Sequence, residues 1–324
     1  MKLTIGIDIG GTNTAIGAVN EKGEVVEQQC ISTPSHGDVD QYITDITNAI
    51  TKLEKKVSSI NPDAEILGIG IGAPNGNFYN GTIEHAPNLS FKGIVPFTEK
   101  LKEKYPKYNE SIALTNDANA AAIGEMVYGG AKGMKTFAMF TLGTGVGSGL
   151  VVDGDLVYGN DGFAGECGHT TLIPGGRKCG CGGFGHLETY CSAPGMKRTA
   201  FEIIARDNAA DSILADKSFN ELESKTIFEA AEAGDKVALE VFEKTGHWLG
   251  ISLADTVHHI SPEAIFLFGG PTSAGDYIFK PTIESLEKHL IPVFKDKVKV
   301  LKSELSLGHA AIVGASALVW KLLE

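Results

Sequence analysis

Two stretches of this chain repeat the same order of strands, and each has a glycine-rich turn in its first hairpin. The first, LTIGIDIGGTNTAIGAVNEKGEVVEQ, starts at Leu3 and predicts three antiparallel strands joined by turns at 10–13 and 21–24. The second, TFAMFTLGTGVGSGLVVDGDLVYG at 136–159, has a glycine-rich turn and a tight DG turn at the matching places. Identity is low, but the shared pattern predicts two copies of one fold, each offering one turn to a shared cleft.

The remaining elements alternate between helices and buried strands. Apolar residues at helical spacing predict helices, and short apolar runs predict buried strands. The expected helices cover 38–57, 97–105 and 310–323, and the expected strands cover 65–73, 111–117, 264–270 and 298–305. From about residue 195 onward the chain is expected to be mostly helical. This order is typical of an α/β protein.

Composition is typical of a soluble globular protein and argues against two classes of partner. The chain has 324 residues, of which 43% are hydrophobic and 21% charged, enough for a large core and two domains. A net charge of −12 without a local basic patch opposes nucleic-acid binding. The N-terminus lacks an apolar signal region, and no run is long enough to cross a bilayer. We therefore expect a cytoplasmic protein with neither a nucleic-acid nor a membrane partner.

The glycine-rich turns are candidates for phosphate binding. The run LGTGVGSG (142–149) precedes a strand rather than a helix, which excludes the dinucleotide fingerprint, and the sequence has no G-K-[ST] for a P-loop. Exposed N–H groups of a glycine hairpin can still face an anion. An ordinary tight turn is the alternative at either place. Two turns at matching positions, with Asp8 beside the first, favour nucleotide phosphates together with Mg²⁺ held by Asp8.

A second candidate is the acid that precedes an alanine-rich helix in LTNDANAAAIGEM (114–126). Asn116 and Asp117 are good helix N-caps, and that structural role is the simplest interpretation of either residue. A helix N-terminus also stabilises an ionised carboxylate, so Asp117 is a candidate general base that accepts a hydroxyl proton. Asn116 would orient the same hydroxyl.

Three of the five cysteines and two of the nine histidines lie in one segment, CGHTTLIPGGRKCGCGGFGHLE (167–188). Cys179 and Cys181 are separated by one residue, a poor spacing for a mutual disulfide, and cytosolic thiols stay reduced. Clustered cysteines in such a protein more often bind metal or take part in chemistry. A catalytic metal, a structural metal and a metal-free loop remain open. Cys30 and Cys191 have no motif around them and are expected to be buried thiols.

Six motifs occur together in the order found in one family. They are DIGGTN (8–13), NDANAAA (116–122), LGTGVGSG (142–149), GECGH (165–169), CGCGGFGHLE (179–188) and FGGP (268–271). On these motifs the chain resembles the ROK-family sugar kinases of the actin/hexokinase-like ATPase superfamily, from residue 3 to the terminal helix. The resemblance implies two ribonuclease-H-like lobes of mixed sheet that flank a central cleft. The small lobe would be 1–116 completed by the helix 312–324, and the large lobe would be 117–311.

The resemblance also implies roles for individual residues. Asp117 would be the base that deprotonates the sugar hydroxyl as it attacks the γ-phosphate of ATP. The sugar would be held by Asn75, Gly76, Asn116, Asp117, Glu166, His169 and Glu188. ATP and Mg²⁺ would be bound by Asp8, Gly10, Gly11, Thr12, Asn13, Gly143, Thr144, Gly145, Gly269 and Gly270. Phosphoryl transfer depends on positioning and charge stabilisation, which such a set of polar groups can supply.

Within this family the cysteine-rich segment implies a structural zinc site in the loop 166–188. Its ligands would be His169, Cys179, Cys181 and His186. Four protein ligands leave no position for a reactive water, so the zinc would be structural. The common pattern has cysteine at the last position, where this chain has His186, and the nearby Cys167 is an alternative ligand.

The implied activity is that of an ATP-dependent hexokinase-type phosphotransferase, with glucose as the expected substrate and glycolysis as the setting. N-acetylglucosamine, N-acetylmannosamine, mannose, allose and fructose are the alternative sugars. Repressors of the same family carry a DNA-binding helix-turn-helix ahead of the phosphate turn, for which residues 1–7 leave no room. A catalytically silent sugar sensor is the alternative of another class, and the presence of Asp8, Asp117 and both turns argues against it. Family members commonly form homodimers, which we expect here.

Overall fold

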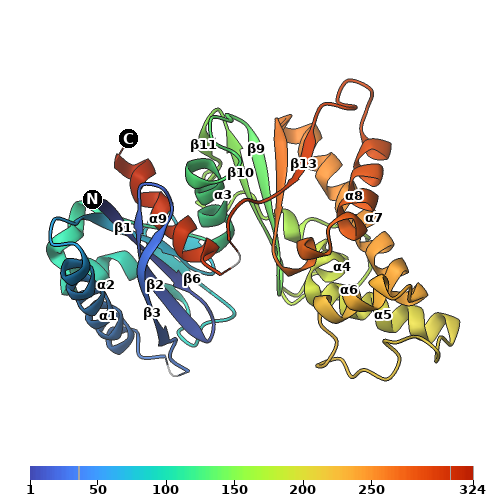
Figure 1. Cartoon of the computed structure of the whole chain (residues 1–324), viewed down its shortest axis with the longest axis horizontal. Coiled ribbons are helices and arrows are strands. Elements are labelled where there is room, and N and C mark those ends of the chain that lie inside the picture. Colours follow the sequence, from blue (N-terminus) through green and yellow to red (C-terminus); the bar gives the residue numbers. More distant parts are fainter. Residues whose placement is uncertain (36, 307, 324) are drawn as a thin grey trace. The chain divides into compact units, whose positions relative to one another are not determined.

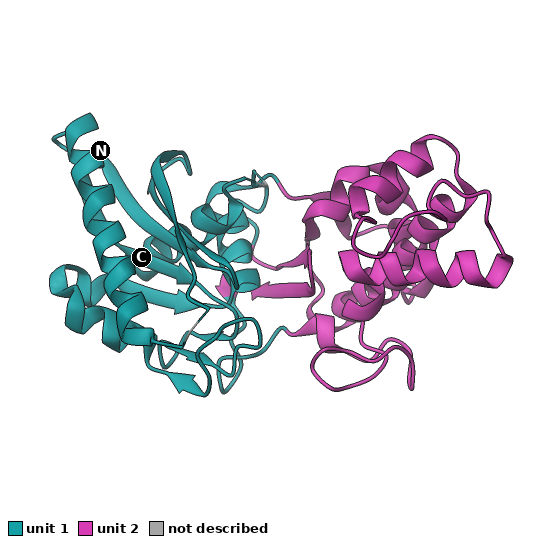
Figure 2. Cartoon of the chain, turned by 90° about the horizontal axis from the view of Figure 1, so that it is seen from below, with its two compact units in different colours: residues 1–134, 156–165, 304–324 teal, residues 135–155, 166–303 magenta. Residues whose placement is uncertain are grey.

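The computed structural model describes residues 1–35, 37–306 and 308–323. These residues form two compact units (Figure 2). Unit 1 contains residues 1–134, 156–165 and 304–324, and unit 2 contains residues 135–155 and 166–303. The chain therefore passes from one unit to the other after residues 134, 155, 165 and 303, so neither unit is a continuous stretch of sequence.

The central sheet of unit 1 has five strands in the order β3-β2-β1-β4-β8 (Figure 1). They are β1 (Lys2–Ile9), β2 (Asn13–Asn20), β3 (Val25–Ser32), β4 (Glu65–Gly72) and β8 (Ile112–Thr115). β1 pairs antiparallel with β2 and parallel with β4, and β4 pairs parallel with β8. A small separate sheet of β5 (Gly76–Asn77), β6 (Thr82–Glu84) and β7 (Ile94–Val95) lies in the connection between β4 and β8.

Helices pack on both faces of this sheet. Side chains alternate along β1, so Leu3, Ile5 and Ile7 point to one face, where they share a core with α1 (Val39–Ile60) and α2 (Phe97–Lys104). The short 3₁₀ helix Pro106–Ser111 leads from α2 into β8. The other face is covered by α3 (Asp117–Tyr128) and by the C-terminal helix α9 (Ala310–Leu323).

Glycines let α9 approach the backbone of the sheet directly. A Cβ atom on Gly6 of β1 would lie 1.9 Å from the carbonyl oxygen of Ile312. A Cβ atom on Gly70 of β4 would lie 1.8 Å from the carbonyl oxygen of Ala315. No side chain fits in either gap, so the position of α9 depends on these two glycines.

The central sheet of unit 2 has the same order, β11-β10-β9-β12-β13. The strands are β9 (Phe137–Leu142), β10 (Val146–Val152), β11 (Asp155–Leu156), β12 (Ala264–Phe268) and β13 (Lys299–Lys302). β9 pairs antiparallel with β10 and parallel with β12, as β1 does with β2 and β4. The prediction of two copies of one fold, each with a glycine-rich turn in its first hairpin, is confirmed.

From about residue 195 onward the chain is mostly helical, as predicted. The helices of unit 2 are α4 (Glu188–Cys191), α5 (Ala193–Asp207), α6 (Ser224–Glu232), α7 (Lys236–Ile260) and α8 (Asp276–His289), with short 3₁₀ helices at Cys167–His169 and Gly270–Ala274. α7 packs against α8, where Gly246 lies next to Pro281. Among the described residues, no helix combines the length and apolar character needed to cross a bilayer.

The compact units do not have the bounds expected for the two lobes. Residues 117–134 were expected to begin the large lobe. They belong to unit 1 instead, because α3 packs against α9 and β4. Residues 156–165 also belong to unit 1, although residues of unit 2 precede and follow them. Contacts made by the folded chain, rather than its sequence order, set these bounds.

The two cysteines outside the motifs differ in exposure. Cys191 is buried, as predicted. The prediction for Cys30 is wrong, because this residue lies on β3, the edge strand of its sheet, and is exposed. Strand residues alternate between faces, and the mixed polar and apolar neighbours of Cys30 do not indicate which face it occupies.

Replacement of Gly70 by alanine is expected to destabilise the protein by about 3 kcal/mol, because the added methyl group must displace α9 from the sheet. Chemical denaturation followed by circular dichroism measures this loss. The matched control is Gly308→Ala, since a Cβ atom on exposed Gly308 meets no atom within 4 Å. Equal stability of the two variants would contradict the close packing of α9.

Candidate active site

The candidate residues of unit 1 follow three parallel strands. β1, β4 and β8 run in one direction, so their carboxyl ends meet at one edge of the sheet, the usual place for a ligand in such sheets. Asp8 and the turn 10–13 lie at the end of β1, Asn75 and Gly76 follow β4, and Asn116 and Asp117 follow β8. The fold therefore brings these distant parts of the sequence to one edge.

Asp8 and Asp117 are close enough for their charges to interact. Burial, and after it the charge of Asp117, raise the pKa of Asp8 to about 6. Part of the Asp117 side chain is exposed, but burial by the surrounding protein raises its pKa as well, against the hydrogen bond from the N–H of Ala118. Carboxylates whose ionised form is disfavoured readily take up a cation or a proton. The pair therefore suits a site in which one acid holds a metal and the other accepts a proton.

The N-cap of α3 is Asn116 rather than Asp117. Asn116 Oδ1 accepts a hydrogen bond from the N–H of Asn119 at 2.6 Å. Asp117 is the first residue of the helix, and its Oδ1 accepts from the N–H of Ala118 at 2.9 Å. The structural role considered for both residues thus belongs to Asn116, and the helix dipole favours negative charge on Asp117.

The turn at 10–13 is closed by its own backbone and held by β3. The N–H of Gly10 donates to the carbonyl of Asn13 at 3.0 Å, and Thr33 Oγ1 donates to the carbonyl of Gly10 at 2.8 Å. Gly11, Thr12 and Asn13 are exposed. The turn is therefore held in one conformation and presents backbone and side-chain donors to solvent.

Asn75 and Gly76 form a tight bend against the end of β8. Asn75 has a left-handed φ of 51°, and its Nδ2 donates to the carbonyl of Glu84 at 3.0 Å. A Cβ atom on Gly76 would lie 2.4 Å from the carbonyl oxygen of Thr115, the residue before Asn116. The bend is thus fixed beside the start of α3.

A buried residue that was not predicted from the sequence, Asn77, ties this bend to the segment 156–165. Its Nδ2 donates to Glu84 Oε1 at 3.1 Å and to the carbonyl of Asp161 at 2.8 Å. The rings of Phe78 and Tyr158 stack nearby, with centroids 4.2 Å apart. Asn77 stands in a short polar run whose pattern does not distinguish it from a surface turn residue.

In unit 2, three motifs meet at Val146, the first residue of β10. Its N–H donates to Glu188 Oε2 at 3.2 Å. A Cβ atom on Gly168 would lie 1.9 Å from the carbonyl oxygen of Val146. On the same strand, Ser148 Oγ accepts from the N–H of Cys167 at 3.0 Å. The GECGH and GHLE segments therefore pack on the strand that follows the second glycine-rich turn.

The second glycine-rich turn lies against the FGGP motif. The N–H of Gly143 donates to the carbonyl of Gly145 at 2.9 Å, and Gly143 and Thr144 are exposed. Gly269 has a φ of 114°, and a Cβ atom there would lie 2.0 Å from the carbonyl oxygen of Leu142. Gly269 is thus placed beside Leu142, the residue before the turn 143–145, and Gly270 follows it in the chain.

Glu188 connects this turn to the cysteine-rich loop. Glu188 Oε2 lies 2.3 Å from the position of a Cβ atom on Gly145, which explains the glycine there. Glu188 Oε1 accepts a hydrogen bond from Cys179 Sγ at 3.5 Å. Glu166, whose side chain is exposed, stands just before the 3₁₀ helix that contains His169.

Two cysteines and two histidines of unit 2 form a group that can hold a metal ion. The ligand atoms of His169, Cys179, Cys181 and His186 all lie within 4.8 Å of one another. Cys179 Sγ is 3.8 Å from His169 Nδ1, and Cys181 Sγ is 3.2 Å from His186 Nδ1. In a tetrahedral zinc site the bonds are about 2.3 Å to sulfur and about 2.0 Å to nitrogen, which places the sulfur and nitrogen atoms about 3.5 Å apart. The donor set and its spacing therefore fit zinc, and in the part of the chain that the structure describes Cys167 lies outside this group.

The predicted residues fall into two sets. Unit 1 holds Asp8, Gly10, Gly11, Thr12, Asn13, Asn75, Gly76, Asn116 and Asp117. Unit 2 holds Gly143, Thr144, Gly145, Glu166, His169, Cys179, Cys181, His186, Glu188, Gly269 and Gly270. The two glycine-rich turns occupy equivalent places, between the first two strands of equivalent sheets.

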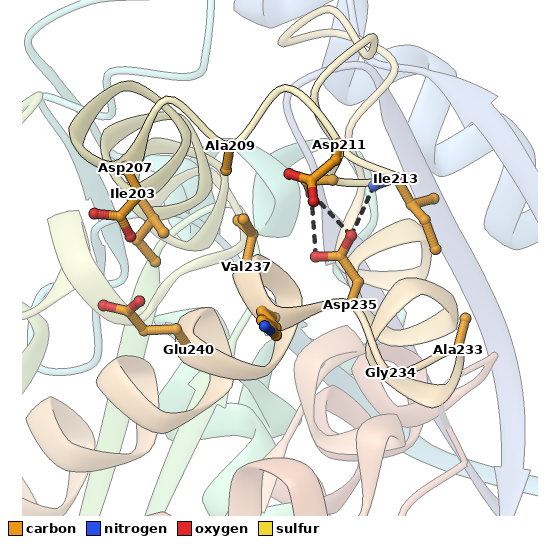
Figure 3. A pocket seen from close by; sticks show the side chains of 12 residues that line it. Ile203, Asp207, Ala209, Asp211, Ile213, Ala233, Gly234, Asp235, Val237 and Glu240 are labelled. Carbon is orange, nitrogen blue, oxygen red and sulfur yellow. Dashed lines mark hydrogen bonds between the residues drawn. The ribbon is translucent and has the colours of Figure 1, made fainter.

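A cavity of about 400 Å³ lies elsewhere in unit 2 (Figure 3). Four acids line it, namely Asp207, Asp211, Asp235 and Glu240. Asp235 is the N-cap of α7, and its carboxylate accepts from Ser212 Oγ and from the N–H of Ile213. None of the predicted site residues lines this cavity, and its acidic wall opposes phosphate binding. It is a structural recess rather than the candidate site.

The chain belongs to the ROK family, whose family model matches residues 4–321. Its fold is that of the ROK kinases, the actin/hexokinase-like ATPase fold. A solved structure of a ROK family glucokinase from Streptomyces griseus, in complex with glucose and AMPPNP, superposes with a TM-score of 0.80. That structure is 32% identical and covers 98% of this chain and 99% of its own.

Curated relatives resemble the chain over nearly its whole length. A glucokinase from Halalkalibacterium halodurans is 36% identical over 320 residues, which are 97% of this chain and 94% of the relative. A glucokinase from Streptomyces coelicolor is 34% identical over 324 residues and covers 98% of both chains.

Protein purified without chelators is expected to contain about one zinc per chain, because the four-residue donor set fits that ion. Elemental analysis of the wild type and of Cys181→Ser measures this, and the variant should lose most of the metal. Cys30→Ser is the matched control, since exposed Cys30 lies on β3 of unit 1 and is not one of the four donors. A wild type without metal would contradict the site.

Proposed function

We propose that this protein is a glucokinase, which transfers the γ-phosphate of ATP to glucose and forms glucose 6-phosphate. The observation that carries the proposal is the pair of glycine-rich hairpins at equivalent places in two equivalent sheets, one beside Asp8 and one beside Glu188. Full-length similarity to glucokinases, including one bound to glucose and AMPPNP, supports the same substrates for this chain.

In this proposal Asp117 is the general base. Its carboxylate accepts the proton of the sugar hydroxyl while the hydroxyl oxygen bonds to the γ-phosphorus, and the bond from that phosphorus to the bridging oxygen of ADP breaks. A raised pKa makes Asp117 a better proton acceptor than an ordinary aspartate. Asn116, fixed as the N-cap of α3, would orient the same hydroxyl.

The phosphates of ATP would be bound by the turns 10–13 and 143–145, with Gly269 and Gly270 beside the adenosine. Mg²⁺ would neutralise charge on the phosphates when it is bound, and Asp8 is the residue that would hold it. A pKa of Asp8 raised to about 6 fits this role, since a nearby cation stabilises the ionised form that burial disfavours.

The sugar would be recognised by polar groups of each unit. They are Asn75, Gly76 and Asn116 in unit 1 and Glu166, His169 and Glu188 in unit 2. In the zinc site His169 faces the other ligands through Nδ1, which leaves its Nε2 side for a sugar hydroxyl. A structural zinc would thus orient a substrate-binding side chain. A cytoplasmic homodimer that acts in glycolysis completes the proposal.

The experiment that tests the proposal is an ATP-dependent phosphorylation assay over glucose, mannose, allose, fructose, N-acetylglucosamine and N-acetylmannosamine. Comparison of kcat/KM decides specificity, and glucose is expected to give the highest value. Preference for an N-acetylated sugar would reassign the substrate but keep the kinase. Absence of turnover on every sugar, in zinc-loaded protein that binds ATP, would favour a silent sugar sensor instead.

Replacement of Asp117 by asparagine is expected to lower kcat by about 10²–10⁴-fold, because the amide cannot accept the hydroxyl proton. Glucose binding, measured by calorimetry, should persist because the amide keeps the shape of the side chain. Asp45→Asn is the control, an exposed acid on α1. Near-normal turnover of the Asp117 variant would exclude this residue as the base.

A further inference from the structure

One arginine of unit 2, Arg177, uses all five N–H donors of its guanidinium. Nη1 donates to the carbonyls of Thr189 and Gly195 at 2.8 and 3.1 Å. Nη2 donates to Thr199 Oγ1 at 2.9 Å, and Nε and Nη2 donate to the carboxylate of Glu202 at 2.9 and 2.5 Å. A guanidinium has five such donors, so none is left without a partner.

The same guanidinium lies against a pair of neighbouring aromatic rings, Tyr190 and Trp248, whose centroids are 4.9 Å apart. Its central carbon is 4.5 Å from the ring centroid of Tyr190 and 5.5 Å from that of Trp248. Its side chain is only 10% exposed, whereas that of its ion-pair partner Glu202 is 59% exposed. Water weakens the ion pair between Arg177 and the exposed carboxylate of Glu202. That ion pair alone therefore does not explain why arginine occupies this position. The planar, stacked and fully bonded geometry is one that lysine cannot reproduce.

The backbone of Arg177 closes the base of the cysteine-rich loop. Its N–H donates to Tyr190 Oη at 2.9 Å, and its carbonyl accepts from the N–H of Gly185 at 2.8 Å. Cys179 and Cys181 lie between these two ends, and His186 follows directly. Hydrogen bonds between protein groups thus join the base of the loop to α4.

Arg177 also fixes the helix on which Glu188 stands. Glu188 is the first residue of α4, and Arg177 bonds to the next two residues. The guanidinium of Arg177 donates to the carbonyl of Thr189, and its backbone N–H donates to the hydroxyl of Tyr190. Gly195, near the start of α5, is held by the same Nη1 atom. Glu188 in turn bonds to Val146 at the second glycine-rich turn.

We propose that Arg177 is a positioning residue for sugar binding, which holds α4 so that Glu188 meets the sugar, and that it does so independently of the zinc. The inference rests on the proposed role of Glu188 in the sugar site. A metal would fix the ligands between Arg177 and His186, whereas Arg177 fixes the base of the loop and the position of Glu188.

The test compares Arg177→Met and Arg177→Lys with the wild type and with Arg206→Met. Arg206, on α5, also bonds to two carboxylates, but it is half exposed and lies over no aromatic ring of the described residues, so it controls for loss of an arginine. Each protein is assayed for the Kd of glucose by calorimetry, for KM of both substrates, for kcat and for zinc content. We expect Kd and KM for glucose to rise about tenfold in both Arg177 variants, as for loss of a charged hydrogen bond. KM for ATP, kcat and zinc content should stay close to wild type, and Arg206→Met should change none of these values.

Chemical rescue adds a readout that general loss of structure would not give. In Arg177→Ala, addition of guanidinium chloride at low millimolar concentration should restore part of the glucose affinity, and sodium chloride at equal concentration should not. Glucose Kd within about twofold of wild type in folded Arg177→Lys would overturn the proposal, as would parallel loss of zinc and glucose binding in every Arg177 variant. Failure of the proposed function shows differently, as a wild type that neither binds nor phosphorylates glucose.

Discussion

The first residue of β10 holds the candidate site of unit 2 together through its own backbone. The N–H of Val146 bonds to Glu188, and its carbonyl lies against Gly168, so both backbone polar groups of one residue face motifs that are distant in sequence. The phosphate turn, the GECGH segment and α4 all depend on this strand. A shift of β10 would therefore displace the groups proposed for nucleotide and for sugar at once, which couples the two without any contact between the ligands.

Much of this arrangement could be predicted from the sequence, because the signals for it lie within short stretches of the chain. The hairpins around 10–13 and 143–145, the helix that follows Asp117 and the Cys/His donor set were predicted because turn chemistry, helical spacing and ligand type are legible in short stretches. The repeated strand order followed from the repeated pattern.

What escaped prediction depends on distant contacts. The bonds of Asn77 to Asp161 and of Arg177 to Thr199 join residues that no periodicity relates. The exposure of Cys30 and the membership of residues 117–134 in unit 1 likewise follow from which surfaces meet after folding. The spacing of residues in the sequence does not predict such features, because the partners of a buried polar group are set only when the chain folds.

The four passages of the chain between the units limit how this protein can be divided. The segment 156–165 packs with unit 1 while both of its ends continue into unit 2, and α9 completes unit 1 from the far end of the sequence. No single cut yields two intact halves, and a fragment that stops before α9 would leave the glycines of β1 and β4 facing water instead of helix backbone. Neither unit can therefore be produced as one uninterrupted fragment of the chain, although each has the strand order of a separate fold.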